Sequence, residues 1–204
     1  LRSAQSSTRG LFVGGQNSSQ AYQDTIEYVT MASTGNSVDF GNLSEAKAAT
    51  GGVESTTRAV FGGGFKAGSA NVNSIEYVTI ASTSNVTDFG DLTTTRYPLA
   101  SGLSNQTRGV FSGMDNSDVT MDYITIASTG NAQDFGDLVG ITVYGYADGK
   151  SNGHGGIDRS VAFASLPAAI GLISGGGNNN TLIAFINIAS TGNEQHFGDL
   201  TTQR

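Results

Sequence analysis

The sequence predicts an all-β protein assembled from four copies of one small antiparallel sheet. Three observations support this class: a composition rich in glycine and small polar residues, a motif that recurs four times, and short segments dense in β-branched and aromatic residues. Gly, Ser, Thr and Asn together supply 89 of the 204 residues. Because these residues are poor formers of helix interiors, we expect no long helix.

Composition also excludes several classes of protein and of binding partner. Apolar residues make up 37% of the chain and charged residues 13%, whereas disordered chains are rich in charge and poor in apolar residues. No apolar run approaches the roughly 20 residues that cross a bilayer, so we expect no membrane insertion. The formal net charge is −7 and the three lysines are far apart in sequence. Since phosphate contacts need clustered Lys and Arg, we expect no nucleic-acid partner.

The repeat is the decisive feature. Each copy has a segment close to Ile-Glu-Tyr-Val-Thr-Ile-Ala-Ser-Thr-Gly-Asn, then an aromatic in Asp-Phe-Gly or a variant of it. Upstream of each lies Arg-Gly-Leu-Phe-Val-Gly-Gly or a relative. The recurring aromatic stands at intervals of 49, 46 and 62 residues, at Phe40, Phe89, Phe135 and Phe197.

Each copy reads as four short strands. In the third copy we place them near 96–103, 107–113, 121–127 and 135–138. The third strand is the clearest, because it is dense in β-branched and aromatic residues. Ser-Thr-Gly-Asn then supplies turn residues, and the Gly doublets that close the second strand allow a tight turn or a close approach of backbone.

Periods of 40 to 50 residues with four strands each are typical of a β-propeller. We therefore expect a single repeat domain over 1–204, with blades at about 1–43, 44–92, 93–138 and 156–200 and an insertion at about 139–155. The four antiparallel blades would form a closed four-bladed ring, part of a larger ring, or an open array. An open array would leave two blade faces bare.

The repeats resemble those of the kelch-type propeller family. The resemblance lies in the Gly doublets 14–15, 62–63 and 175–176, the Tyr-bearing strand and the aromatic of the fourth strand. Kelch repeats carry Trp where this chain has Phe. The repeat sequence Tyr-Val-Thr-Ile-Ala-Ser-Thr-Gly-Asn…Asp-Phe-Gly-Asp-Leu-Thr is similar to the repeats of kelch-like arrays in virion structural proteins of marine tailed phages. That resemblance covers nearly the whole chain and implies a virion protein at a tail or fibre.

Two sets of repeated residues are expected to be structural. Arg9, Arg58 and Arg108 are lost in the fourth copy together with the acid of the third strand, because Ile170 and Ala184 stand there. Buried charges tend to be lost in pairs, so we expect the arginines to pair with these acids, within one repeat or across neighbouring blades, rather than to form a ligand-binding ring; the acids are Glu27, Glu76 and Asp122. The repeated phenylalanines are expected in the core.

The insertion is the best candidate for a ligand site, since loops carry function more often than core elements. Tyrosines beside Asn, Asp, His and glycines could contact a sugar or a protein. The alternative is an ordinary connection between blades. The candidate residues are Tyr144, Tyr146, Asp148, Lys150, Asn152 and His154.

Catalysis and cofactors are not expected. The chain has no Cys and only two His, and it lacks the Gly-x-Ser-x-Gly pattern of a nucleophilic serine. We therefore expect a non-enzymatic virion structural and adhesion module, on the virion surface or otherwise extracellular, that binds other virion proteins or a host glycan or protein through loops such as 16–23 and 66–71. The alternatives are a carbohydrate-binding lectin and a self-assembling block that forms a homo-oligomer. The sequence begins at Leu1 rather than Met, so we expect it to be processed or part of a longer protein.

Overall fold

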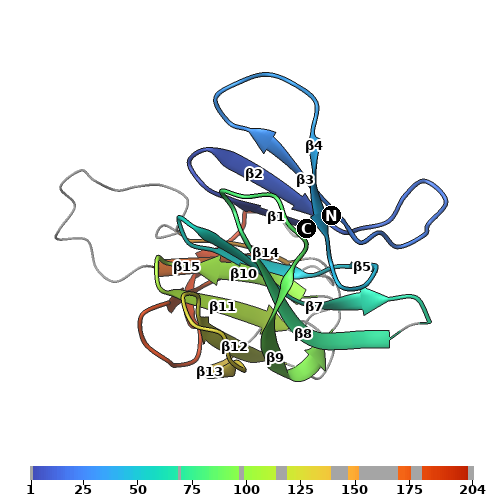
Figure 1. The fold of residues 1–204 in the computed structure, drawn as a ribbon. Helices are drawn as coiled ribbons and strands as arrows, with labels where there is room; N and C mark the ends of the chain where they lie inside the picture. Colours follow the sequence, from blue (N-terminus) through green and yellow to red (C-terminus); the bar gives the residue numbers. More distant parts are fainter. Residues whose placement is uncertain are drawn as a thin grey trace.

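The protein is all-β, as the sequence predicts. The structure is a computed structural model that describes residues 2–68, 70–96, 99–113, 119–138, 147–151, 170–175 and 181–201. Within these ranges every regular element is a strand, and the strands form four antiparallel sheets (Figure 1). Among the described residues there is no helix that could cross a membrane.

The four sheets follow one another along the chain, and we number them sheets 1 to 4. Sheet 1 contains β1 (Arg2–Gln5), β2 (Arg9–Val13), β3 (Thr25–Thr30) and β4 (Val38–Asn42). Sheet 2 contains β5 (Lys47–Ala48), β6 (Gly51–Glu54), β7 (Arg58–Lys66), β8 (Ala70–Thr79) and β9 (Thr87–Arg96). Sheet 3 contains β10 (Leu99–Ser104), β11 (Arg108–Gly113), β12 (Thr120–Thr125) and β13 (Gln133–Asp137). Sheet 4 contains β14 (Ala147–Ser151), β15 (Ile170–Gly175), β16 (Leu182–Asn187) and β17 (Gln195–Asp199).

Two segments differ from the loop assignments made from sequence. The segment 66–71 is not a plain loop, because β7 and β8 extend into a long hairpin in which Lys66 pairs with Ala70. In the region 139–155, assigned above to an insertion, β14 pairs with β15 and supplies the first strand of sheet 4. The loop over residues 16–23 remains irregular apart from one bridge between Gln16 and Tyr22.

The same β-bulge recurs in every sheet between the third and the fourth strand. In sheet 1 the register shifts between Ile26 and Glu27, and Ile26 pairs with Gly41. The corresponding shifts occur in the other three sheets, at Ile75/Glu76, Met121/Asp122 and Ile183/Ala184. A bulge bends the outer strand and changes where its side chains point. The recurring Phe-Gly step therefore has the same register in each repeat, although Gly198 of sheet 4 lacks the positive φ of Gly41, Gly90 and Gly136.

The two faces of each sheet carry different side chains. Side chains of directly paired residues lie on the same face, so Arg9, Leu11 and Tyr28 share one face of sheet 1, whereas Phe12 and Glu27 share the other. We call the face with the first residue of the second strand (Arg9, Arg58, Arg108 or Ile170) the trailing face. The opposite face is the leading face.

The core lies between consecutive sheets. Three buried clusters each combine the trailing face of one sheet with the leading face of the next. Between sheets 1 and 2, Leu11 and Phe40 pack with Phe61 and Ile80. The first strands follow the same order, since β1 lies against β6, β6 against β10 and β10 against β14. Among the described strands, β1 and β14 show no comparable contact.

Candidate functional site

The arginine that opens each second strand joins two sheets. Its guanidinium lies over a tyrosine ring of its own sheet, with the Cζ atom 4.2 Å from the ring centroid for Arg58 and Tyr77. The same guanidinium donates through a terminal nitrogen to the carbonyl of Ile126 in the next sheet, at 2.9 Å. Arg9 and Arg108 repeat both contacts, with Tyr28 and the Ile80 carbonyl and with Tyr123 and the Ile188 carbonyl. Each arginine is therefore a structural link between neighbouring sheets.

These partners replace the pairing with Glu27, Glu76 and Asp122 that the sequence suggested. The strand register gives the reason: in sheet 1, Arg9 is paired with Thr30, whereas Glu27 is paired with Phe12. Positions 9 and 12 lie on opposite faces of one strand, since side chains alternate along it. An arginine and an acid of the same repeat therefore point toward different neighbouring sheets. Across the junction of sheets 2 and 3, Arg58 donates to the Ile126 carbonyl, and Asp122 accepts from Thr93 instead.

The acids instead receive hydrogen bonds from the chain that leaves the preceding sheet. The buried Asp122 accepts from the backbone N–H of Thr93 at 3.0 Å and from its hydroxyl at 2.8 Å. Glu76 accepts from the backbone N–H of Ser44 at 3.2 Å. Ser44 and Thr93 hold the same place in their repeats, two residues beyond Gly-Asn or Gly-Asp. The acid of one sheet thus holds the exit strand of the sheet before it.

In sheets 2 to 4, the asparagine of the turn after the third strand caps the outer strand of the preceding sheet. The Oδ1 atoms of Asn85, Asn131 and Asn193 accept from the backbone N–H groups of Asn42, Asp91 and Asp137, at 3.0, 3.1 and 3.0 Å. A return bond follows, as between the N–H of Ala132 and the carbonyl of Asp91 at 2.8 Å. The turn is therefore part of the sheet junction as well as a connection.

A glycine of the outer strand makes room for that turn. Gly90 has a φ of +143°, and a Cβ atom at this position would lie 2.5 Å from the carbonyl oxygen of Gly130 in the next sheet. Gly41 and Gly136 have the same backbone conformation and the same crowding, against Ser84 and Gly192. Any other residue would require the two sheets to separate, because a Cβ has no space there.

The recurring phenylalanines are core residues in three of the four sheets, as expected. Phe40, Phe89 and Phe135 are 2–3% exposed, and each lies edge-on to the tyrosine that carries the arginine. Phe197 makes the corresponding contact with Phe185, but its exposed fraction is 63%. Among the described residues, the Phe197 ring therefore contacts an aromatic of its own sheet and lies outside the three core clusters.

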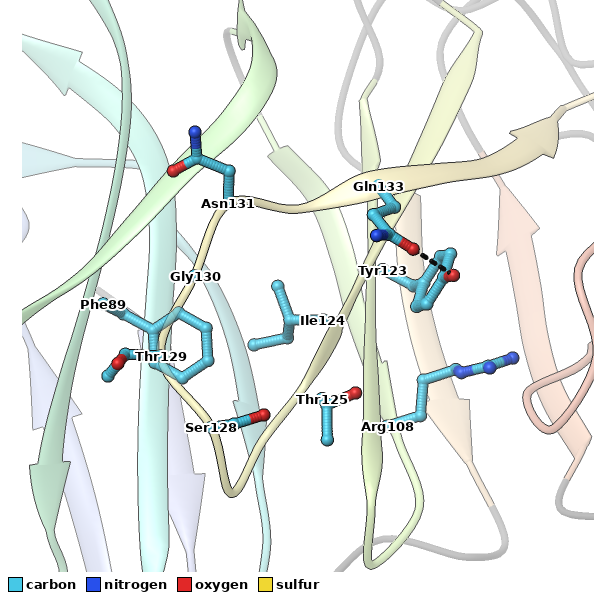
Figure 2. A pocket seen from close by; sticks show the side chains of 10 residues that line it. All are labelled: Phe89, Arg108, Tyr123, Ile124, Thr125, Ser128, Thr129, Gly130, Asn131 and Gln133. Carbon is cyan, nitrogen blue, oxygen red and sulfur yellow. Dashed lines mark hydrogen bonds between the residues drawn. The ribbon is translucent and has the colours of Figure 1, made fainter.

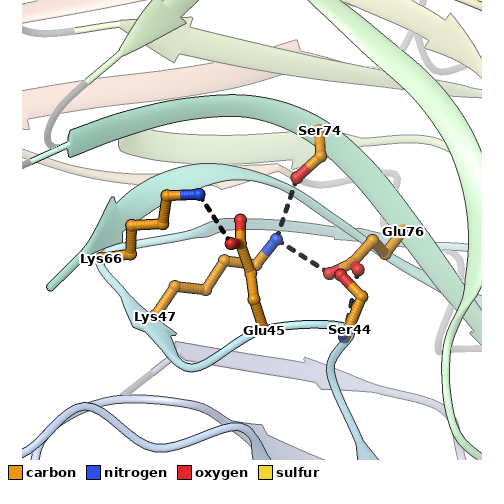
Figure 3. A network of polar contacts seen from close by, with 6 residues as sticks. All are labelled: Ser44, Glu45, Lys47, Lys66, Ser74 and Glu76. Atoms are coloured by element: carbon orange, nitrogen blue, oxygen red, sulfur yellow. Dashed lines mark hydrogen bonds and ion pairs between the residues drawn. The ribbon is translucent and has the colours of Figure 1, made fainter.

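Sheet 2 contains a buried ion pair that has no counterpart in the repeat pattern (Figure 3). The side chain of Lys47 is 0% exposed, and its Nζ atom lies 2.8 Å from Glu76 Oε2. The same ammonium donates to the hydroxyl of Ser74 at 3.2 Å. A second pair, Lys66 with Glu45, lies nearby at the same distance but is more than one third exposed on each side. Lys47 thus neutralises the acid that also holds Ser44.

A pocket opens where the turn of sheet 3 bends away from the strands (Figure 2). Its volume is about 310 Å³, and polar side chains dominate its lining. The Tyr123 hydroxyl donates to Gln133 Oε1 at 2.5 Å beside the Arg108 side chain (Figure 2). A smaller pocket of about 90 Å³ lies under the equivalent turn of sheet 4. The lining of the larger pocket comprises Phe89, Arg108, Tyr123, Ile124, Thr125, Ser128, Thr129, Gly130, Asn131 and Gln133.

The linings of the two pockets consist of hydroxyl, amide, guanidinium and apolar groups. Among the described residues around the two pockets there is no carboxylate, imidazole or thiol that could act as a general base or nucleophile. Hydroxyl, amide and guanidinium groups beside an aromatic ring are suited to a small polar ligand. In the part of the chain that the structure describes, no group of three or more His, Asp or Glu could hold a metal ion.

The predicted ligand residues of the 139–155 region are only partly described. Asp148 and Lys150 lie in β14, where their backbones pair with Ser174 and Leu172. Tyr144, Tyr146, Asn152 and His154 lie outside the described residues. The structure therefore brings none of these six side chains into a described site, and their role stays a prediction.

Sequence comparison adds no relative from which a function could be transferred. No protein-family model matches the chain, and no curated protein matches it.

Proposed function

We propose that this chain is a non-enzymatic structural and adhesion module of a virion surface, positioned at a phage tail or fibre, with its four sheets acting as kelch-like blades of a propeller-type array. The blades form the frame, and the connections at their ends make contact with the host. The partner is a host surface glycan or protein, or another virion protein.

The observation that carries the proposal is the threefold repetition of one rigid junction. At every junction an arginine crosses to a carbonyl of the next sheet, and an asparagine caps the outer strand of the previous one. Contacts of this kind hold consecutive sheets at a fixed distance and angle. A scaffold that presents binding loops needs this rigidity, whereas an enzyme would also need a reactive centre.

The loop over residues 16–23 is the best described candidate for host contact. Its side chains are largely exposed, and the Oδ1 atom of Asn17 accepts from the backbone N–H groups of Ser19 and Ala21, both at 3.0 Å. A loop that is ordered by its own hydrogen bonds loses little conformational entropy when it binds. This supports a preformed contact surface on sheet 1.

Binding to cells tests the adhesion role. We expect the fluorescently labelled chain to bind a subset of marine bacterial strains saturably, and unlabelled chain to compete. Replacing residues 16–23 by a Gly/Ser segment of equal length should reduce binding, while Val38→Glu, a change at an exposed site on β4, should leave it unchanged. Absence of binding to every strain in a broad panel would contradict the adhesion role.

The pocket in sheet 3 favours one alternative, a carbohydrate-binding lectin. Its polar lining beside Tyr123 and Arg108 has the chemistry of a sugar site. A glycan array with the intact chain would test it. Saturable binding that is lost in Gln133→Ala but kept in Thr87→Ala, the same position in sheet 2, would place sugar binding in this pocket and support the lectin, whereas the absence of glycan binding would contradict it.

The propeller arrangement is tested separately by electron microscopy of the purified chain. The order of contacts between β1, β6, β10 and β14 is compatible with first strands placed around an axis. Class averages with blades around a centre would support the propeller, and averages of an extended stack would contradict it.

A further inference from the structure

Two sheet faces that are buried everywhere else in the repeat array are bare at its two ends. On the trailing face of sheet 4, Phe197 and Leu172 are 63% and 37% exposed. Their counterparts in sheets 1 to 3 are at most 3% exposed; these are Phe40, Phe89 and Phe135, and Leu11, Val60 and Val110. A solenoid that ended in a true capping repeat would present a polar outer face here.

The leading face of sheet 1 is bare in the same way. Met31 is 53% exposed, whereas the residues at its position in sheets 2 to 4, Ile80, Ile126 and Ile188, are at most 1% exposed. This face therefore carries the apolar side chains that normally pack against a preceding sheet, and it has no such sheet among the described residues.

Each bare face carries a residue type that takes part in the three junctions between consecutive sheets. Gly198 occupies the sequence position at which Gly41, Gly90 and Gly136 make room for the next turn. It lacks their positive φ, and a Cβ atom on it would meet nothing within 4 Å. On sheet 1, Asn36 stands where other asparagines cap the previous sheet, and it has no partner among the described residues. Gly198 leaves space for a turn, and Asn36 lies on a turn that has no outer strand to cap. The two positions are therefore complementary.

The acid on a leading face and the exit residue of the preceding sheet vary together along the repeats, and this pattern also matches sheet 4 to sheet 1. An acid on a leading face goes with a hydroxyl at the exit of the preceding sheet, as in Ser44 with Glu76 and Thr93 with Asp122. Where the acid is missing, at Ala184, the exit residue is Val139. The exit of sheet 4 again carries a hydroxyl, Thr201, and the leading face of sheet 1 again carries an acid, the exposed Glu27. By this rule the exit of sheet 4 is matched to the entry of sheet 1.

We infer that the trailing face of sheet 4 binds the leading face of sheet 1 of a second copy of the chain, head to tail, through a fourth junction of the internal type. Phe197 and Leu172 would pack on Met31, the Asn36 side chain would cap the backbone N–H of Asp199, and Thr201 would bond Glu27. A heterologous contact of this kind gives a ring when its rotation closes and a filament when it does not. The inference goes beyond the proposed function, because it concerns only the contact of the chain with itself.

Sedimentation velocity of the purified chain, from nanomolar to high micromolar concentration, tests the inference. We expect concentration-dependent association that is weakened about tenfold or more by Phe197→Glu and by Met31→Glu, a change of about 1.4 kcal/mol or more in the free energy of association. Val38→Glu is the matched control. Val38 is 54% exposed, and its counterparts in the other sheets, Thr87, Gln133 and Gln195, are exposed as well, so this variant should associate like the parent chain.

Gly198→Ala separates assembly from folding. Because a Cβ at Gly198 has free space in the single chain, we expect an unchanged melting temperature but weaker association. A parent chain that remains monomeric at high concentration would overturn the inference. Association that neither Phe197→Glu nor Met31→Glu weakens would overturn it as well.

Disulfide trapping identifies the partner, and the natural chain contains no Cys to interfere. We expect Asn36→Cys mixed with Asp199→Cys to give covalent dimers, while each variant alone gives few. Asn42→Cys/Asn85→Cys is the internal positive control, since these two residues meet at the first junction. A monomer with an intrachain disulfide in Asn36→Cys/Asp199→Cys would show that the chain closes on itself and would overturn the two-copy contact.

Discussion

Arg58 shows how a single side chain can determine the spacing of two sheets. Its guanidinium is held over Tyr77 and donates to Ile126 in the next sheet. The planar group can make both contacts at once because stacking uses its face and hydrogen bonding uses its edge. The ring beneath it is held edge-on by Phe89, so arginine, tyrosine and phenylalanine form one unit.

Replacing Arg58 should therefore destabilise the fold. Arg58→Met removes the cation–π contact and leaves the Ile126 carbonyl without this donor, so we expect a loss of about 2–3 kcal/mol in the free energy of unfolding. Arg58→Lys, which keeps the charge and a donor but not the planar stack, should lose less. Denaturant unfolding followed by circular dichroism measures both. An unchanged midpoint for Arg58→Met would show that the arginine is only a surface group.

The two lysine pairs of sheet 2 allow a matched comparison of a buried and an exposed ion pair. Lys47→Met leaves the carboxylate of Glu76 buried without its counter-charge, which should cost about 3–5 kcal/mol. Lys66→Met breaks a partly exposed pair and should cost less than about 1 kcal/mol. The double variant Lys47→Met/Glu76→Leu should recover part of the loss. Equal losses for the two lysine variants would contradict the buried pair.

The sequence could predict residues that recur but not the partners that they find. Repetition identified Arg58 and Phe89, and the expected core position of Phe89 is confirmed. The predicted partner of the arginine was wrong, because Arg58 donates to a carbonyl of the next sheet. The acid bonds the exit residue of the preceding sheet, and in the fourth copy, where Ala184 replaces the acid, that exit residue is Val139. Lys47 carried no signal, since it occurs in one repeat only.

At the level of elements, the outer strand of each sheet does more than complete the ladder. The bulge against the third strand directs Phe89 into the junction with sheet 3, and Gly90 then admits the turn of that sheet. The prediction of four strands per repeat holds in sheets 1, 3 and 4, whereas sheet 2 has a fifth strand, because β5 and β6 both pair with β7. The length of β7 and β8 was not predictable, since the sequence 66–71 reads as a polar loop and pairing of its flanks depends on the hairpin register.

The outer strands of sheets 2 and 4 should respond differently to the same substitution. Phe89→Ala empties a site that is 3% exposed and should cost about 3–5 kcal/mol. Phe197→Ala removes a ring that is 63% exposed, so we expect less than about 1 kcal/mol when unfolding is measured at a concentration where the chain is monomeric. Comparable losses at both positions would mean that sheet 4 is covered in the single chain.

At the level of the whole molecule, stability is a sum of contacts between neighbours. Each described core cluster involves two consecutive sheets, as in repeat proteins whose units touch only the units beside them. Within the described part of the chain, sheets 2 and 3 are covered on both faces, while sheets 1 and 4 are each covered on one. The repeat period therefore predicted the number of units and their order, but whether the ends meet depends on the rotation at each junction, which no single repeat encodes.

The difference in protection between the inner sheets and the two end sheets should be visible in amide hydrogen exchange followed by NMR. The backbone N–H groups of Asn42, Asp91 and Asp137 are bonded to asparagines of the next sheet, so they should exchange slowly at every concentration. The equivalent N–H of Asp199 should exchange fast in dilute solution, because opening there requires no separation of sheets. If copies join head to tail, its exchange should slow as concentration rises. An Asp199 amide as protected as that of Asp91 in dilute solution would mean that sheet 4 already has a neighbour within its own chain.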